Sequence, residues 1–141
     1  MDIVSSLQVK GLGNTGRQCF IKWANKYVTP KLDYSVSGED LYNARCAILH
    51  TLWIESDMSN RGANLIVYRS GRKKMDLELN EMHSKILKKI ANRDIIILWI
   101  DDLISAFNEA TNECLDDIYN DTQLKKNFLA RANKMIIDFQ L

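Results

Sequence analysis

The chain has 141 residues, which is room for one domain of ordinary size and too little for two independent enzyme domains. Hydrophobic residues make up 46% and charged residues 26%, so neither a disordered chain nor a fibrous repeat is expected. One proline and six glycines allow few tight turns, which disfavours a β-sandwich or β-barrel. We therefore expect a single all-α domain over residues 1–141.

The net charge of +1 conceals two neighbouring blocks of opposite sign. Residues 61–93 contain nine Lys or Arg and three Asp or Glu, whereas residues 94–121 contain eight acids and no Lys or Arg. A basic stretch of this density could neutralise several phosphates of a nucleic acid. The two blocks could equally pair with each other, within the fold or across a dimer. Both interpretations stay open.

The first half of the chain predicts a flexible lead-in and two helices. The lead-in covers residues 1–16. A helix is expected over residues 17–28, where apolar residues recur at spacings of three and four, and Pro30 ends it. Ser37 has a carboxylate three residues further on, which is typical of a helix start. A second helix is predicted over residues 38–54.

The second half predicts a short β-hairpin followed by further helices. Residues 64–78 lose the helical period, carry β-branched and aromatic side chains, and contain a turn at Gly71, so they predict the hairpin. Helices are then expected from Asn80 to about residue 90, from Ile95 to about Tyr119, and from about Asp121, with an apolar tail at the end. The fold class is therefore all-α with a small β-hairpin as an accessory.

Signals for export, membrane insertion, metals and cofactors are weak. The longest apolar run covers residues 95–100, whereas a membrane-spanning helix needs about 20 apolar residues. The N-terminus lacks the basic and apolar regions of a secretory signal, so we expect a cytoplasmic location and no membrane partner. Cys19, Cys46 and Cys114 are far apart, so we expect reduced thiols, no metal site and no cofactor.

One apparent nucleotide-binding motif is set aside. Residues 11–16 match G-x-G-x-x-G, the phosphate-binding pattern of dinucleotide-binding folds. That pattern binds phosphate only where a buried strand leads into a helix, and residues 5–10 make a poor core strand. We interpret the motif as part of the flexible lead-in.

The second predicted helix contains Arg45 and His50, two residue types that are unusual in a core. Arginine is a permanent planar cation that matches phosphate oxygens, and histidine transfers a proton near neutral pH without a metal. RNA cleavage through attack of the 2′-hydroxyl on the adjacent phosphorus needs both functions. Arg45 is therefore a candidate phosphate clamp and His50 a candidate general acid and base.

The spacing of this pair predicts a second copy of the chain. Five positions place the two side chains about 140° apart around an ideal helix and about 7.5 Å apart along it. Two copies packed antiparallel along this helix would bring the arginine and histidine of different copies together, so we expect a homodimer. The alternative is an arginine paired within its own subunit and a core histidine with satisfied hydrogen bonds.

Arg45 and His50, with four residues between them, resemble the R-x(4–6)-H motif of the HEPN superfamily. Residues 40–56 are similar to those of its uncharacterised bacterial members. The resemblance implies a HEPN-like domain: an up-and-down bundle of four to five helices, a homodimer with two motifs in one cleft, and metal-independent endoribonuclease activity. Many members have a polar residue directly after the arginine, where this chain has Cys46. Some members are non-catalytic modules that bind a protein partner or a nucleotide, which is the alternative function.

Four further residues are candidates for binding an RNA substrate. Arg61, Arg69 and Lys73 surround Tyr68, and basic residues around an aromatic ring can follow a nucleic-acid backbone while the ring stacks on a base. Asn43 shares a helix face with His50. Alternatively, the basic residues pair with the acidic stretch and Tyr68 packs inside the hairpin.

Overall fold

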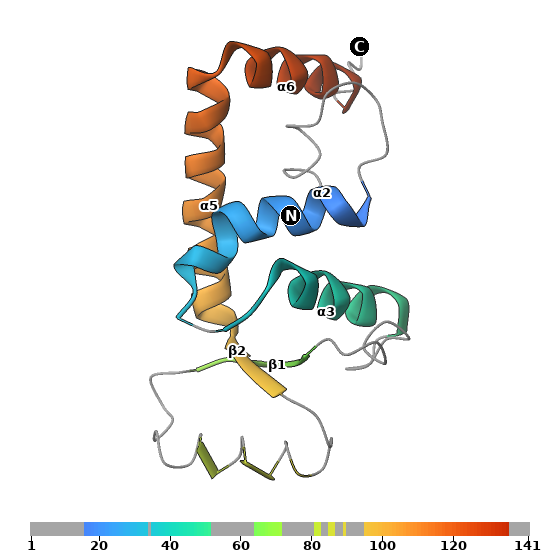
Figure 1. Cartoon of the computed structure of the whole chain (residues 1–141), viewed down its shortest axis with the longest axis vertical. Helices are drawn as coiled ribbons and strands as arrows, with labels where there is room; N and C mark the ends of the chain where they lie inside the picture. The colour runs from blue at the N-terminus through green and yellow to red at the C-terminus, as the bar shows by residue number, and fades with distance from the viewer. Residues whose placement is uncertain are drawn as a thin grey trace, which may run out of the picture.

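The computed structural model describes residues 16–33, 35–51, 64–71, 81–82, 85–86, 89 and 95–135, and it describes only the backbone of residues 49–51 and 134–135. These residues are mainly helical, as the composition predicts, and include a pair of short strands (Figure 1). Within the described ranges, no helix combines the length and the apolar character that crossing a bilayer demands.

Helices occupy most of the predicted positions. Helix α2 (Arg17–Trp23) continues through a π-helical turn, η1 (Ala24–Val28), and a 3₁₀ turn, η2 (Thr29–Lys31), so the predicted first helix is confirmed and Pro30 falls in the tighter turn at its end. Helix α3 (Gly38–Thr51) confirms the second helix, whose predicted last turn lies outside the described residues.

Two more helices complete the C-terminal half. Helix α5 (Ile100–Asn120) is the longest described helix, and α6 (Thr122–Met135) follows it. Asp121 separates them and caps α6, because its Oδ1 accepts hydrogen bonds from the backbone N–H groups of Gln123 and Leu124 at 2.7 and 2.9 Å. In Figure 1, α5 runs along the long axis of the molecule, while α2, α3 and α6 lie across it.

The sequence predicts that a helix starts at Ile95, and this is wrong. Residues Ile95–Trp99 form strand β2, and α5 begins only at Ile100. The run opens with three isoleucines, whose branched side chains lose rotamer freedom in a helix and fit a strand with both faces covered. A short apolar run of this kind does not distinguish strand from helix by its periodicity.

Strand β1 (Leu65–Arg69) confirms the predicted strand, but its partner differs from the predicted one. It pairs in parallel with β2, in a register that runs from Leu65 opposite Ile95 to Arg69 opposite Trp99. A hairpin requires antiparallel arms, so this pair is not the predicted hairpin. The second predicted arm, near residue 76, lies outside the described residues. Of the helix predicted from Asn80, residues 81–82, 85–86 and 89 are helical and the others lie outside the described part.

The core lies where α2 and η1 cross α5. Trp23 donates a hydrogen bond from Nε1 to Cys114 Sγ at 3.3 Å, and its ring centroid lies 5.8 Å from that of Tyr27 and 6.0 Å from that of Phe107. Burial raises the pKa of the Cys114 thiol, which keeps this sulfur protonated. Three of the four buried residues of α5 are small, namely Ala106, Ala110 and Cys114. These small residues leave space for the large aromatic rings beside the helix backbone.

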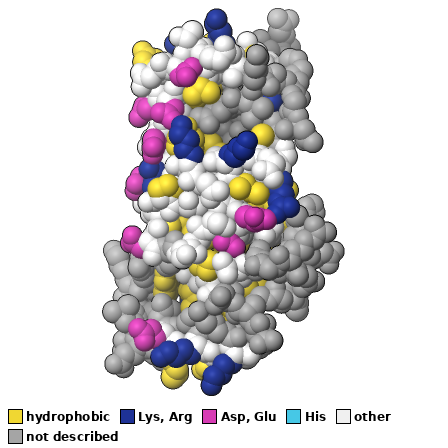
Figure 2. All heavy atoms as spheres, in the orientation of Figure 1, with side chains coloured by type: hydrophobic (Ala, Val, Ile, Leu, Met, Phe, Trp, Pro, Cys, Tyr) yellow, Lys and Arg dark blue, Asp and Glu magenta, His cyan; other side chains and the backbone are white. Residues whose placement is uncertain are grey.

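Two lysines of the N-terminal segment pair with acids of α5. Lys26 Nζ lies 2.7 Å from Asp117 Oδ2, and the buried Tyr27 hydroxyl donates to the same oxygen at 2.8 Å. Hydrogen bonds from Lys26 and Tyr27 lower the pKa of Asp117, and the bond to Asp117 raises the pKa of Lys26. Lys31 pairs with Glu113 one turn away. Two acids of the 94–121 block are thus neutralised by the N-terminal segment. Figure 2 shows acidic side chains along the edge of the molecule where α5 lies.

We expect Asp117→Asn to lower the free energy of unfolding near neutral pH by about 1 kcal/mol, because it weakens a half-exposed ion pair and one hydrogen bond to a buried hydroxyl. Folding lowers the pKa of Asp117, so its carboxylate stabilises the fold above the unfolded-state pKa of about 3.9 and loses that effect as the pH falls through the folded value. Folding raises the pKa of Lys26, so its contribution holds below about pH 10.4 and is lost above it.

The measurement is urea unfolding of both proteins from about pH 2.5 to pH 9. The difference between them should be constant from about pH 5 to pH 9 and shrink below about pH 4. Asp116→Asn is the matched control, since the Asp116 side chain is exposed on the same helix. An Asp117→Asn difference that does not change with pH contradicts the proposed role of the ion pair.

Candidate functional site

Helix α3, which carries Arg45 and His50, is fixed against α2 at its first residue. The backbone N–H of Gly38 donates to Asn25 Oδ1 at 2.7 Å. A Cβ atom on Gly38 would lie only 2.6 Å from the carbonyl oxygen of Ile21. Glycine is therefore required here, because any side chain would push α3 away from α2.

Asp40 joins the start of α3 to the start of β1. It is 5% exposed, and its Oδ2 accepts hydrogen bonds from the Ser37 backbone N–H and hydroxyl at 2.9 and 2.6 Å. The Ser37 hydroxyl oxygen in turn accepts from the Asp40 N–H at 3.1 Å, which confirms the predicted cap. Asp40 Oδ1 accepts from the Asn64 N–H at 3.0 Å. This last bond is not predictable from a cap pattern, because it depends on a segment 24 residues away.

Two guanidinium groups meet at one aromatic ring on α3. Arg45 Cζ lies 5.8 Å from the centroid of the Tyr42 ring, and Arg17 Cζ, from the first turn of α2, lies 5.9 Å from it. These distances are within the range of attraction between a cation and an aromatic ring. Arg17 also forms an ion pair with Glu39, while Arg45 Nη1 lies 3.8 Å from Cys46 Sγ. Arg17, Tyr42 and Arg45 are hereafter called the arginine–tyrosine cluster.

The ring at the centre of this cluster is held by the core. Phe20 packs against Tyr42 in a T-shaped arrangement, with 5.4 Å between the centroids. Burial raises the pKa of the Tyr42 hydroxyl, so this group is neutral and protonated at physiological pH. The two arginines therefore provide positive charge at this place, and both are only partly buried.

The residues predicted to bind substrate have different surroundings. Asn43 is 4% exposed, and its Oδ1 is a buried atom with no hydrogen-bond partner among the described residues. Arg69 is half-buried at the end of β1, a strand that contacts α3. Arg61 and Lys73 lie outside the described residues. Tyr68 is half-buried and packs against the core, and burial raises the pKa of its hydroxyl.

The backbone of His50 belongs to α3, and its imidazole lies outside the described part of the structure. Arg45 and His50 are therefore five positions apart on one continuous helix. No sequence motif includes Arg17, which contacts the Tyr42 ring because α2 packs on α3. The only available signal was its position in the first turn of a predicted helix.

Within the ranges that the structure describes, no group of three or more His, Cys, Asp or Glu residues is arranged to hold a metal ion. The three cysteines, all of them among the described residues, form no disulfide. Comparison of the chain with protein-family models, with curated proteins and with solved structures gives no match.

We expect Gly38→Ala to lower the free energy of unfolding by about 1 to 3 kcal/mol, because the added methyl group overlaps the Ile21 carbonyl oxygen. In an unhindered helix the change from glycine to alanine stabilises the folded protein by about 0.5–1 kcal/mol. A loss of stability at Gly38 therefore indicates the close approach of α3 to α2. Urea unfolding followed by circular dichroism measures it. Asn112→Ala, on the exposed side of α5, is the control and should change stability by less than about 0.5 kcal/mol. Equal or greater stability of Gly38→Ala would contradict the described contact.

Proposed function

We propose that this chain is a metal-independent endoribonuclease that acts as a homodimer of HEPN-like helical domains. Arg45 holds the phosphate, and His50 acts as general acid and base. The observation that supports the proposal is the arginine–tyrosine cluster, in which a second cation, Arg17, contacts the same ring as Arg45. The alternative, a non-catalytic dimeric module that binds a nucleotide or protein partner, also makes use of this cluster.

The chemistry requires few protein groups. The ribose 2′-hydroxyl attacks the adjacent phosphorus, the bond to the 5′-oxygen breaks, and a 2′,3′-cyclic phosphate and a 5′-hydroxyl result. An imidazole removes the proton from the 2′-oxygen and, in its protonated form, supplies one to the leaving 5′-oxygen. A guanidinium stabilises the additional negative charge on the phosphate oxygens in the transition state. Arg45 and His50 supply these two functions.

The helix geometry supports a site that two copies share. Because α3 is continuous from Gly38 to Thr51, Arg45 and His50 diverge by about 140° around its axis. An antiparallel pair of α3 helices places Arg45 of one copy beside His50 of the other. Ile48 lies one turn after Arg45, about 60° from it around the helix, and is 45% exposed, so the Arg45 side of α3 presents apolar surface that a second copy could cover.

Cleavage of a mixed-sequence single-stranded RNA in the presence of excess chelator tests the activity. We expect the wild type to release products with 2′,3′-cyclic phosphate ends, and we expect His50→Ala and Arg45→Ala each to lose at least 100-fold in rate. Arg45→Lys retains the charge but not the planar fork and should have an intermediate rate. Lys22→Ala, an exposed change on α2, is the control with unchanged rate. The same oligonucleotide with 2′-O-methyl groups should resist cleavage. Absence of cleavage by the wild type ends the nuclease proposal.

Mixing inactive variants tests whether the site is shared between copies. A dimer with one Arg45→Ala chain and one His50→Ala chain holds one complete arginine–histidine pair and one site that lacks both groups. Random exchange makes half of the dimers mixed, so an equimolar mixture should recover about a quarter of the wild-type rate. Recovery should follow the rate of subunit exchange. If the mixture stays as inactive as either variant alone after exchange is complete, the two groups do not act across copies.

A further inference from the structure

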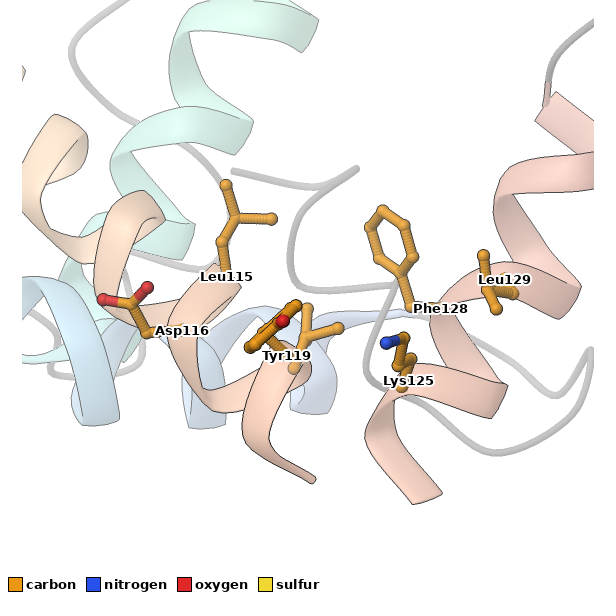
Figure 3. Close-up of a pocket in the computed structure, with 7 residues that line it drawn as sticks. Leu115, Asp116, Tyr119, Lys125, Phe128 and Leu129 are labelled. Carbon is orange, nitrogen blue, oxygen red and sulfur yellow. The ribbon is translucent and has the colours of Figure 1, made fainter. Parts of the chain in front are cut away.

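The junction of α5 and α6 forms an open apolar pocket that the proposed activity does not use. Its volume is about 370 Å³. Leu115 and Tyr119 line it from α5, and Phe128 and Leu129 line it from α6 (Figure 3). Lys125 reaches toward Tyr119, with Nζ 4.9 Å from the ring centroid. The pocket thus combines apolar walls with charged groups at its margin.

Apolar side chains are exposed at the pocket and again at Ile104, about three turns earlier on the same side of α5. Tyr119 is 75% exposed, Ile104 54%, Leu129 49% and Leu115 44%. Ile104 and Leu115 are eleven positions apart, close to three helical turns, and Tyr119 follows one turn later, so the three share one side of the helix. Exposed apolar residues that form a continuous surface usually mark a binding site.

The two helices beside this surface carry opposite charge. Helix α5 contains six acids and no Lys or Arg, while α6 contains four Lys or Arg and no acid. Lys26 and Lys31 pair with two of these acids, Asp117 and Glu113. Glu109 and Asp116 are exposed on α5, as Lys125 and Lys126 are on α6.

Within one chain, α6 does not cover the acids of α5, because it leaves the end of α5 and runs across its direction (Figure 1). A second copy offers a basic α6 to the acidic α5 of the first copy and an acidic α5 to its basic α6. In a two-fold arrangement the basic α6 of each copy lies along the acidic α5 of the other, so every favourable contact is made twice. The same arrangement covers the apolar residues that are exposed in a single chain.

We propose that the α5–α6 surface, formed by Ile104, Leu115, Tyr119, Phe128 and Leu129 with the charges beside them, binds a second copy of this chain through reciprocal α5–α6 contacts. This interface uses no residue of α3, so it is distinct from the pairing that the proposed catalytic site requires. Charge complementarity determines the partner, because a chain that offers both an acidic and a basic helix around one apolar surface is complementary to itself. Raising the salt concentration should weaken the association.

Charge reversal on either helix tests the interface. One variant carries Lys125→Glu and Lys126→Glu, and the other carries Glu109→Lys and Asp116→Lys. Each variant alone brings like charges together at both contacts, so its mass in sedimentation at about 100 μM should be half that of the wild type. An equimolar mixture restores opposite charges at both contacts, and the mass should return to the wild-type value. Pairing through α3, where present, is unchanged in all samples, so the loss of mass in the reversed variants measures the α5–α6 contact alone; where α3 also pairs, the loss is at least twofold.

A neutral variant and a control complete the experiment. Tyr119→Ser with Leu129→Ser should also halve the mass, and salt should not rescue it, because it removes apolar contact. Lys22→Glu, a charge reversal on the exposed side of α2, should leave the mass unchanged. Circular dichroism and thermal melting establish that each variant is folded.

The proposal is wrong if the wild type has the same mass as the reversed variants. This is also the result expected if the surface binds a different protein. Failure of the mixture to recover also overturns it. Neither result depends on RNA cleavage, which is measured separately.

Discussion

The packing of Trp23 and Tyr27 onto the small-residue face of α5 is the contact on which the other contacts of the structure depend. Large aromatic rings bury the most apolar surface per residue, and here two of them approach the helix backbone because Ala106 and Ala110 occupy little space. The ion pair of Lys26 with Asp117 fixes the position of η1 along α5. Helix α3 is then held on α2 through Gly38, and Asp40 ties α3 to β1. The place of Arg45 thus follows from a chain of contacts that begins in the core.

The arginine–tyrosine cluster is electrostatically unusual because two guanidinium groups approach one ring. Glu39 forms an ion pair with Arg17 at the edge of the cluster. The face of the Tyr42 ring attracts both cations, and it is fixed by Phe20. The cluster therefore combines two cations and one carboxylate around a ring that the core holds in place.

Sequence patterns within a few residues predicted the helix positions. The features that these patterns missed depend on contacts between segments far apart in the chain. The start of α3 follows from Ser37 and Asp40, whose hydrogen bonds span three residues and are visible in the sequence. Strand β2 was missed because an isoleucine run suits a buried helix and a buried strand alike, and only its pairing with β1 decides between them. The same holds for the site: a helical wheel predicts that Arg45 and His50 diverge, but it contains no information about Arg17, which reaches Tyr42 from another helix.

The parallel register of β1 and β2 also constrains how the protein is made. Leu65 pairs with Ile95, which is 30 residues further along the chain, so the strands can pair only after the segment between them has been made. In a hairpin the two strands follow each other directly, and this delay is much shorter. The contact between Trp23 and Cys114 forms later still during synthesis, because the two residues are 91 positions apart. A ribosome must therefore release most of the chain before either the ladder or the core can close. Until then, Trp23 and Tyr27 lack the helix that buries them, and the nascent chain needs protection from self-association over that interval.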